Sequence, residues 1–546
     1  MFLRTQTNGS RTYLLVVENE RVGSTVRQRI LHRLGRLDQL QESGQLDALI
    51  NGLGRFSDKL LVLGAHARGE TLTAETAHIG AALIFERLWK ACGIRAVLNG
   101  LLAARRFEFS VERAIFLTVL HRLIAPGSDR AAERWRADYV IEGAEELELH
   151  HLYRAMAWLG EPLSAQVGAT PFAPRTMKDV IEERLFARRR DLFTALDLVF
   201  FDTTSIYFEG HGGAPLGQYG KSKDHRPDRK QMVVALVLDG DGYPVCSEVW
   251  PGNTTDVSTL VPIVDRLNQQ FHIRHVCIVA DRGMIKAKAI EAIEARKWSY
   301  ILGVRMRNSK EARDIVLADQ APYEEVFERN GGGKGPAALK VKEVLVGDHR
   351  YIVCLNEDQV VTDRRDREAI VAALRDALNE GDKALVGNKG YRKYLKTSGE
   401  RFAIDDAKVE AEARYDGVWV LRTNTDLEPM VVALAYKHLW MVEQIFRSMK
   451  SVLETRPVYH KREETIRGHV FCSFLALLLR KELENRLAEK RWKLEWADVV
   501  HDLDRLQETR LTLKGAGYVV RSQPHGVAGK VFQACGVALP PVIRPC

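Results

Sequence analysis

Three acidic residues, far apart in the chain, have the types and surroundings of ligands for divalent cations. Asp202 interrupts an apolar stretch, LDLVFFDTTSIYFE, and Asp281 directly follows another, HVCIVA. A carboxylate inside so apolar a strand is costly unless it is paired or bound to metal. Glu443 lies in a third segment, AYKHLWMVEQIFRSMK, with Tyr436 and Lys450 seven residues to either side. Oxygen ligands that converge from separate elements are what two-metal cleavage of a phosphodiester requires.

The chemistry expected of these acids is cleavage of a phosphodiester. Mg²⁺ or Mn²⁺ would suit them, because both cations prefer carboxylate and water oxygens. Asp202, Asp281 and Glu443 are therefore the candidate catalytic residues and candidate ligands of two ions. An ordinary alternative stays open for each acid: a strand-terminal aspartate is commonly a turn former or helix cap. From its own helix alone, Glu443 is better explained by an exposed i,i+4 pair with Arg447, worth only about 0.3 kcal/mol.

The residues around Glu443 have the character of phosphate contacts. A spacing of seven places Tyr436, Glu443 and Lys450 about two turns apart on one helix face. Arg447, four residues after Glu443, lies close to that face. Arginine grips a phosphate through two parallel hydrogen bonds, whereas lysine acts as a point charge. We expect Tyr436, Arg447 and Lys450 to contact DNA.

Two further segments are rich in basic residues. The loop 221–230, KSKDHRPDRK, holds five Lys or Arg against two Asp, directly after the first apolar strand. It would guide a DNA end, although a solvated loop is an equally good interpretation. The candidate DNA contacts in this loop and just beyond the Glu443 helix are Lys223, His225, Arg226, Arg456 and His460. His225, His460 and His469 lack a zinc-ligand spacing, so ordinary polar roles are expected for them.

The elements that must position the acids form a mixed pattern of strands and helices from residue 196 onwards. A strand is followed by the hairpin QMVVALVLDGDGYPVCSEVW, whose Asp241-Gly242 favours a tight turn. A helix over 257–270, the strand ending at Asp281, a helix over 286–296 and the strand SYILGVR complete the series. Three antiparallel strands followed by helix, strand, helix and strand form the ribonuclease H-like arrangement. In it the strands of the two aspartates are neighbours.

An insertion separates this core from the segment of Glu443. Residues 308–415 include the strand-like runs ALKVKEVLV and YIVCLN, a charged helix near 363–378 and a further strand pair near 402–423. The Gly-rich bend NGGGKGP lacks the spacing of a nucleotide-binding P-loop. Helical pattern returns at about 430, stops before Pro457, and resumes over about 465–487.

The N-terminal part is expected to be mainly helical. A short strand over Thr12–Val17 precedes a helix-like run, VRQRILHRLGRLDQL, and residues 75–195 show helical periodicity. Pro126-Gly127-Ser128 breaks the helices, with Ser128 as an N-cap. Two helices joined by such a turn fit a DNA-reading helix-turn-helix or an ordinary bundle hairpin equally well. We expect this region to bind DNA or to dimerise.

Composition restricts the class of protein. The 546 residues carry a net charge of +8 and a pI near 9.0, which favours polyanionic partners but does not establish one. Seven scattered cysteines without a CxxC predict reduced thiols. No signal peptide or membrane-spanning run is evident. These features predict a cytoplasmic protein with no membrane partner, associated with the nucleoid when bound to DNA.

Several stretches together resemble a known family. They are FFDTTSIYFEG, YGKSKDHRPDRKQMVVALVLDGDGYPV, PGNTTD, VADRGMI, LWMVEQIFRSMKSVLETRPVYH and, near the N-terminus, RTYLLVVENERVGSTVRQRILHRLGRLDQL. On these the chain resembles bacterial insertion-sequence transposases with a DDE triad, a YREK signature and a β-strand insertion before the Glu. The triad then corresponds to Asp202, Asp281 and Glu443. The signature corresponds to Tyr436, Glu443 and Lys450, with Leu439 where an Arg is expected.

The resemblance implies a ribonuclease H-like catalytic domain, a Mg²⁺ or Mn²⁺ cofactor and cut-and-paste transposition. The expected partners are double-stranded DNA, as terminal inverted repeats and target, and a second copy of the chain. Two rivals are a DNA nuclease that cannot join ends and a non-catalytic DNA-binding descendant of a transposase. The fold class is multidomain α/β, with five segments. They are a mainly helical 1–195, a first core part 196–307, a β-rich insertion 308–425, core helices 426–490 and a tail 491–546.

Overall fold

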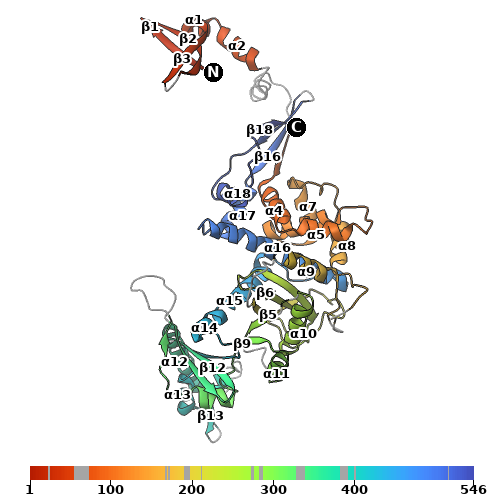
Figure 1. Ribbon diagram of the computed structural model, residues 1–546, viewed down its shortest axis with the longest axis vertical. Coiled ribbons are helices and arrows are strands. Elements are labelled where there is room, and N and C mark those ends of the chain that lie inside the picture. The colour runs from red at the N-terminus through yellow and green to blue at the C-terminus, as the bar shows by residue number, and fades with distance from the viewer. Residues whose placement is uncertain are drawn as a thin grey trace. The chain divides into compact units, whose positions relative to one another are not determined.

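The computed structural model forms two compact units, each built from separated parts of the chain (Figure 1). The first unit comprises residues 1–84, 136–141 and 492–546, and the second comprises 85–135 and 142–491. The structure describes residues 1–22, 25–54, 73–166, 169, 173–189, 197–210, 212–271, 273, 276–281, 287–326, 339–380, 391–398, 401–513 and 516–546. The Gly-rich bend at 330–336 lies outside the described residues.

A nine-stranded mixed sheet forms the centre of the second unit, in the order β10-β11-β12-β15-β9-β8-β5-β6-β7. Its strands are β5 (Asp197–Tyr207), β6 (Gln231–Leu238), β7 (Pro244–Pro251), β8 (Val276–Ala280), β9 (Ser299–Gly303), β10 (Glu324–Glu325), β11 (Leu339–Val346), β12 (His349–Asn356) and β15 (Val418–Thr423). β5, β6 and β7 pair antiparallel, whereas β8 and β9 run parallel to β5. The predicted hairpin is confirmed, and Gly242 in its turn has a φ of +79°.

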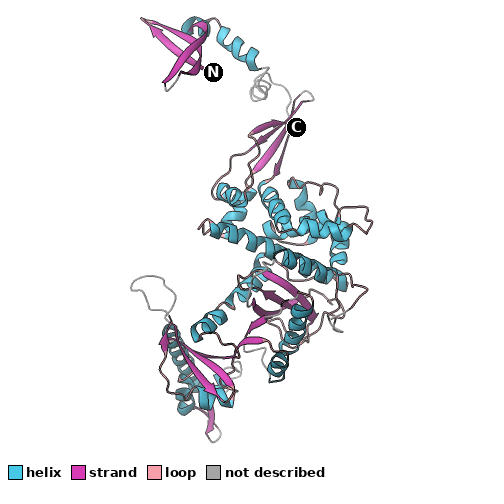
Figure 2. Cartoon of the chain, in the orientation of Figure 1, coloured by secondary structure: helices cyan, strands magenta, loops and turns pink. Residues whose placement is uncertain are grey.

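Helices cover both faces of this sheet, as the cartoon shows (Figure 2). α10 (Asp256–Gln269) and α11 (Ala287–Ala295) lie close to their predicted positions and enclose a core with Phe201 and Trp250. Two further helices contact the β5–β7 part of the sheet: α15 (Trp440–Arg447) packs on β5 and β6, and α16 (Glu463–Glu489) packs on β7. Every residue of β6 and β7 is buried; β6 is a nearly continuous apolar run, whereas β7 also buries Ser247 and Glu248.

The insertion extends the same sheet instead of forming a separate one. β15 pairs with β9 and with β12, and β12 pairs with β11. The predicted charged helix is confirmed as α12 (Glu357–Glu380). The two strands predicted near 402–423 are present as β14 (Arg401–Ile404) and β15, but they do not pair with each other. α13 (Asp406–Ala413) separates them, and β14 pairs with β13 (Leu395–Ser398). Val420 of β15 instead packs with Tyr351 and Val353, so burial places this strand in the large sheet.

The helices before the sheet form a bundle. They are α4 (Gly80–Ala91), α5 (Ile94–Leu102), α6 (Val111–Ile124), α7 (Asp129–Trp135), α8 (Leu149–Leu159) and α9 (Met177–Arg189). All residues of α6 are buried, and α6 packs on α8 and α16. Ser128 caps α7 as predicted, because its Oγ accepts from the Ala131 N–H at 3.2 Å. α6 is therefore a core helix of the bundle, whereas α7 buries only Ala132.

The first unit is richer in strands than the sequence predicts. β1 (Phe2–Asn8), β2 (Arg11–Val22) and β3 (Thr25–Arg36) form an antiparallel sheet, followed by α1 (Leu37–Glu42) and α2 (Gln45–Gly54). The helix predicted for VRQRILHRLGRLDQL is therefore wrong up to Arg36, and a mainly helical 1–195 is corrected at its start. Pairing with β2, which buries Leu15 and Val17, outweighs the helical spacing of apolar residues.

A second small sheet completes this unit, in the order β18-β17-β16-β4. Its strands are β4 (Thr73–His78), β16 (Gln507–Leu513), β17 (Ala516–Arg521) and β18 (Ile543–Pro545), and its helices are α17 (Trp496–Asp504) and α18 (Ala528–Cys535). All seven cysteines of the chain are free thiols, as predicted. No helix of the described chain is long and apolar enough to cross a membrane.

Candidate active site

The sheet register brings Asp202 and Asp281 to neighbouring positions. β5 and β8 are parallel neighbours, with Phe201 opposite Ala280. Asp202 and Asp281 are the next residues of the two strands, at the carboxyl end of β8. The Thr203 N–H donates to Asp202 Oδ1 at 2.7 Å. The predicted adjacency of the two aspartates therefore holds at the level of the backbone.

The segment of Glu443 is not one continuous helix, and that expectation is wrong. It consists of α14 (Pro429–Lys437), α15 and a π-helical turn, η6 (Ser448–Val452). Leu439 is buried at the joint, where its N–H donates to the Tyr436 carbonyl and its own carbonyl accepts from the Val442 N–H. These bonds span three residues, so the backbone is wound more tightly just before α15. In η6, which is a π-helical turn, the backbone is wound more widely. Irregular turns of this kind are frequent at functional sites.

A cavity of about 310 Å³ brings three of the predicted residues together. Asp281, Tyr436 and Glu443 line it, and the Tyr436 hydroxyl donates to Asp281 Oδ1 at 3.0 Å. The other lining residues are Leu339, Asn356, Trp419, Lys437, Leu439 and Trp440. The first three of these belong to the insertion, which therefore forms one wall of the cavity.

The acidic groups at this edge are only weakly neutralised by protein cations. Lys223 Nζ lies 3.9 Å from Asp202 Oδ1. Within the described residues, neither Asp281 nor Glu443 forms an ion pair, so the pair with Arg447 considered above is not made. The oxygens of the three acids do not all lie within 4.8 Å of one another; among the residues described, only Asp129, His460 and His469 meet that criterion.

The basic loop folds back onto β5. Lys223 Nζ donates to the Thr203 carbonyl at 2.7 Å and to its Oγ1 at 2.9 Å, while the Lys223 N–H donates to Ser205 Oγ. Arg226 forms two hydrogen bonds with Asp228, and its guanidinium lies 5.3 Å from the Tyr207 ring centre. His225 is exposed, with a φ of +56°. Lys223 thus contacts the strand of Asp202 directly.

Asp224, which the sequence interpretation did not single out, joins two of the predicted phosphate contacts. Its Oδ1 lies 2.5 Å from both Lys450 Nζ and Arg456 NH1. The Asp224 side chain is only 3% exposed, and its buried Oδ2 has no hydrogen-bond partner among the described residues. Burial lowers the pKa of Lys450, although the Asp224 carboxylate opposes that shift. The one clue in the sequence was an acid inside a strongly basic run.

The remaining predicted contacts lie apart from the cavity. Arg447 is exposed at the end of α15, without an ion pair in the described part of the chain. His460 is turned away, with its Nε2 3.2 Å from Asp129 Oδ2. Leu439, at the position of the expected Arg, is buried and lines the cavity, so it offers no charge.

Comparison with known proteins adds the family. Residues 194–479 match the Transposase DDE domain, and residues 3–67 match the IS1634 family transposase, N-terminal domain. The first match contains Asp202, Asp281 and Glu443, and the second contains the β1–β3 sheet. None of the curated proteins compared matches the chain. The chain therefore belongs to the transposase DDE-domain family and is an insertion-sequence transposase, a class of protein that acts on DNA.

Proposed function

We propose that this transposase cuts the ends of an insertion sequence and joins them to target DNA at Asp202, Asp281 and Glu443. The observation that carries the proposal is the geometry of the sheet edge. Asp202 and Asp281 follow directly paired residues of β5 and β8, and Glu443 lines one cavity with Asp281. The order β7-β6-β5-β8-β9 further supports a ribonuclease H-like core.

The donor set fits Mg²⁺ or Mn²⁺. The three candidate ligands are hard carboxylate oxygens, and the described residues that line the cavity include no thiol or imidazole and one cation, Lys437. Two such ions, when bound, would polarise the scissile phosphate and stabilise charge on the attacking and leaving oxygens. The three acids would be brought closer by the cations that they share.

The surrounding residues would orient the acids and the phosphate. The Tyr436 hydroxyl holds Asp281 through its hydrogen bond and limits rotation of the carboxylate. Lys450 and Arg456 would bind a DNA phosphate in exchange for Asp224, since a phosphate offers them the same kind of anionic oxygen. Tyr436, Glu443 and Lys450 would thus fill three of the four signature positions, leaving that of Leu439 empty.

The DNA path would involve the other predicted contacts. Lys223, His225, Arg226 and Arg447 are the candidate contacts close to the sheet edge. The insertion wall formed by Leu339, Asn356 and Trp419 would shield the transposon end. Because two ends must be held for cut-and-paste transposition, the active form would be a dimer on DNA.

A joining assay tests this function. The purified chain is incubated with Mg²⁺, pre-cut DNA ends from the sequence flanking its gene, and a target plasmid. We expect joined products with wild type and none with Asp202→Asn. Glu291→Gln, which removes an exposed acid on α11, is the matched control and should join normally.

Two outcomes would contradict the proposal. Cleavage without joining in every condition would identify a nuclease. Normal joining by Asp202→Asn would show that the chemistry lies elsewhere in the chain.

A further inference from the structure

A basic groove lies in the second unit, apart from the cavity of Asp281 and Glu443. It has a volume of about 1100 Å³ and is bordered by α7, α8, the segment 454–462 and the start of α16. We call it the α8 groove. The lining residues that matter here are Arg130, Tyr153, Arg154, Tyr459, Lys461 and Arg462.

The charge of the α8 groove favours an anionic ligand. Five Lys or Arg line it against two acids, Asp129 and Glu454. Three of the five, Arg130, Lys461 and Arg462, are exposed and form no ion pair with any residue that the structure describes. Exposed cations without a protein partner are available to phosphate groups.

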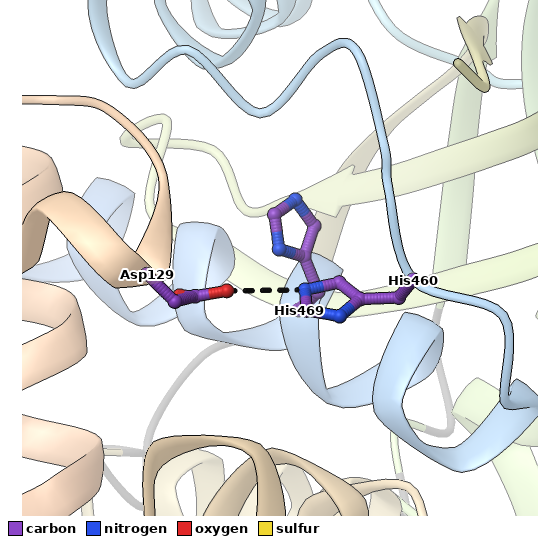
Figure 3. Close-up of side chains that lie close together, drawn as sticks. All are labelled: Asp129, His460 and His469. Carbon is purple, nitrogen blue, oxygen red and sulfur yellow. Dashed lines mark ion pairs between the residues drawn. The ribbon is translucent and has the colours of Figure 1, made fainter. Parts of the chain in front are cut away.

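One wall of the groove is fixed by a partly buried cluster of Asp129, His460 and His469 (Figure 3). His460 Nε2 faces Asp129 Oδ2 at 3.2 Å, which attaches the segment 454–462 to the start of α7. Burial raises the pKa of Asp129, but the His460 hydrogen bond and the Arg122 charge outweigh it and hold that pKa at about 2. Asp129 is therefore ionised and already paired, and it adds little repulsion toward an anion.

The same cluster is a poor metal site, although its ligand atoms lie within 4.8 Å of one another. His469 Nδ1 lies 2.8 Å from Arg122 NH2, which donates to it, and His469 Nε2 lies 3.1 Å from the Thr455 carbonyl. Both ring nitrogens are thus engaged, and a guanidinium stands where a cation would bind. The cluster positions the groove wall and leaves the groove itself for anions.

Exposed aromatic rings accompany the cations. Tyr459 is 65% exposed and Tyr153 is 38% exposed, and both line the groove. The Tyr153 ring packs edge-on against His460, with centres 5.4 Å apart, so it is held in place. Aromatic faces next to cations are the usual combination for binding unpaired bases and their backbone.

The groove is linked through Arg456 to Lys450, one of the predicted phosphate contacts. Arg456 lines it and also contacts Asp224, which contacts Lys450. At another part of its edge, Arg154 and Arg462 also line a second depression, of about 580 Å³, that includes Arg105. An extended, polyanionic ligand fits such a path better than a small molecule does.

We propose that the α8 groove holds a single DNA strand, binding its phosphates through Arg130, Lys461 and Arg462 and stacking a base on Tyr459. The proposal rests on the proposed function and adds the substrate form and its path. A rigid duplex would meet only the rim of such a concavity, whereas an unpaired strand would expose bases to the tyrosines.

DNA binding in EDTA, where cleavage is prevented, tests the groove. Fluorescence anisotropy is recorded with a labelled single strand and with its duplex for the full chain. The groove variant combines Arg130→Gln, Lys461→Gln and Arg462→Gln. A matched charge control combines Arg87→Gln, Arg184→Gln and Lys297→Gln, three exposed cations outside the groove. Circular dichroism verifies that both variants are folded.

We expect the groove variant to lose much more single-strand affinity than the control. The salt slope of single-strand binding should fall by about 2, since each phosphate contact contributes about 0.7. Tyr459→Ala should weaken single-strand binding by at least about fivefold, while Tyr459→Phe should bind like wild type.

Two results would overturn the proposal. One is a groove variant that binds like the charge control. The other is equal loss for single strand and duplex, with no effect of Tyr459→Ala, which would assign the groove to duplex DNA. Cleavage and joining by the wild-type chain with Mg²⁺ are measured in parallel. They remain normal if the proposed function is right and only the groove assignment fails.

Discussion

Two groups of carboxylates border the same sheet but have opposite surroundings. Near β7, Asp179, Glu182 and Glu248 surround Arg266, with oxygen–nitrogen distances of 2.6–2.8 Å. Lys178 adds a second buried cation, 2.6 Å from Asp179. At the carboxyl end of β8 the acids instead face a cavity, and the described residues give Asp281 and Glu443 no ion pair.

The difference separates acids that the fold neutralises itself from acids that it leaves open to a cation from outside the protein. In the β7 cluster, the side chains of Lys178 and Asp179 are 2% and 3% exposed, so the charges must be paired inside the protein. At the carboxyl end of β8, Asp281 and Glu443 line an open cavity and have no ion-pair partner among the described residues. We therefore expect changes in the first group to alter stability and changes in the second to alter chemistry.

The largest effect is expected for Glu443→Gln. Loss of one ligand carboxylate should lower strand cleavage by roughly 10³-fold or more, as for other residues that act as a unit. The free energy of unfolding should stay within about 0.5 kcal/mol of wild type, because the Glu443 side chain is exposed and forms no ion pair with any described residue. Cleavage of labelled DNA ends and urea unfolding measure the two effects. A large loss of stability would place Glu443 with the structural acids.

Arg266→Met should instead lower stability strongly rather than alter the chemistry. Removing the arginine leaves three buried carboxylates with Lys178 alone, which should cost about 3–5 kcal/mol of unfolding free energy. Arg296→Met breaks a half-exposed pair with Asp265 and should cost less than about 1 kcal/mol. Urea denaturation compares the two variants. Equal, small losses would show that the β7 cluster is not needed for stability.

Acid should destabilise the fold through His121. Burial first, and then the Arg122 charge, lower the pKa of His121 to about 4 from its ordinary 6.5. Between pH 6.5 and 4, the unfolded chain therefore binds a proton at His121 that the folded chain does not bind. Stability from this group is complete above pH 6.5 and falls as pH drops toward 4, by about 3 kcal/mol in total.

Unfolding by urea at several pH values measures this dependence. His121→Gln, which cannot titrate, should show a shallower loss between pH 6.5 and 4 than wild type. Identical slopes for the two proteins would contradict the assignment to His121.

A smaller effect is expected at the connection between the loop and η6. Asp224→Asn keeps the side-chain shape but removes the carboxylate that competes with DNA phosphate for Lys450 and Arg456. DNA affinity should rise about fivefold, equivalent to about 1 kcal/mol. Anisotropy titration measures this, with Asp228→Asn in the same loop as control. Weaker binding by Asp224→Asn would instead show that the carboxylate holds the two cations in a productive position.

Much of the core could be predicted because its signals are local. Apolar runs and the Asp241-Gly242 turn define β5 to β9, and parallel pairing of β5 with β8 then follows from the order of elements. That pairing brings Asp202 and Asp281 together. The expected position of α16 was equally local, since its apolar stretch is long.

The rest depends on contacts between distant segments. β3 has helical spacing of apolar residues, yet it pairs with β2. The joint at Leu439 and the π turn arise from packing on the sheet, which a seven-residue spacing does not reveal. Asp224 and Lys450 are 226 positions apart, so only the folded chain makes their contact visible. The α8 groove likewise requires α7 and the segment 454–462 to meet.

The most direct test of the central claim is a metal switch at Asp281. Asp281→Cys replaces a hard carboxylate oxygen with a softer thiolate, which disfavours Mg²⁺ more than Mn²⁺. Cleavage of DNA ends by this variant is measured with each cation beside wild type. We predict cleavage with both ions for wild type, none for Asp281→Cys with Mg²⁺, and partial recovery with Mn²⁺. Wild-type cleavage by Asp281→Cys in Mg²⁺ would contradict the claim that Asp281 holds the catalytic cation.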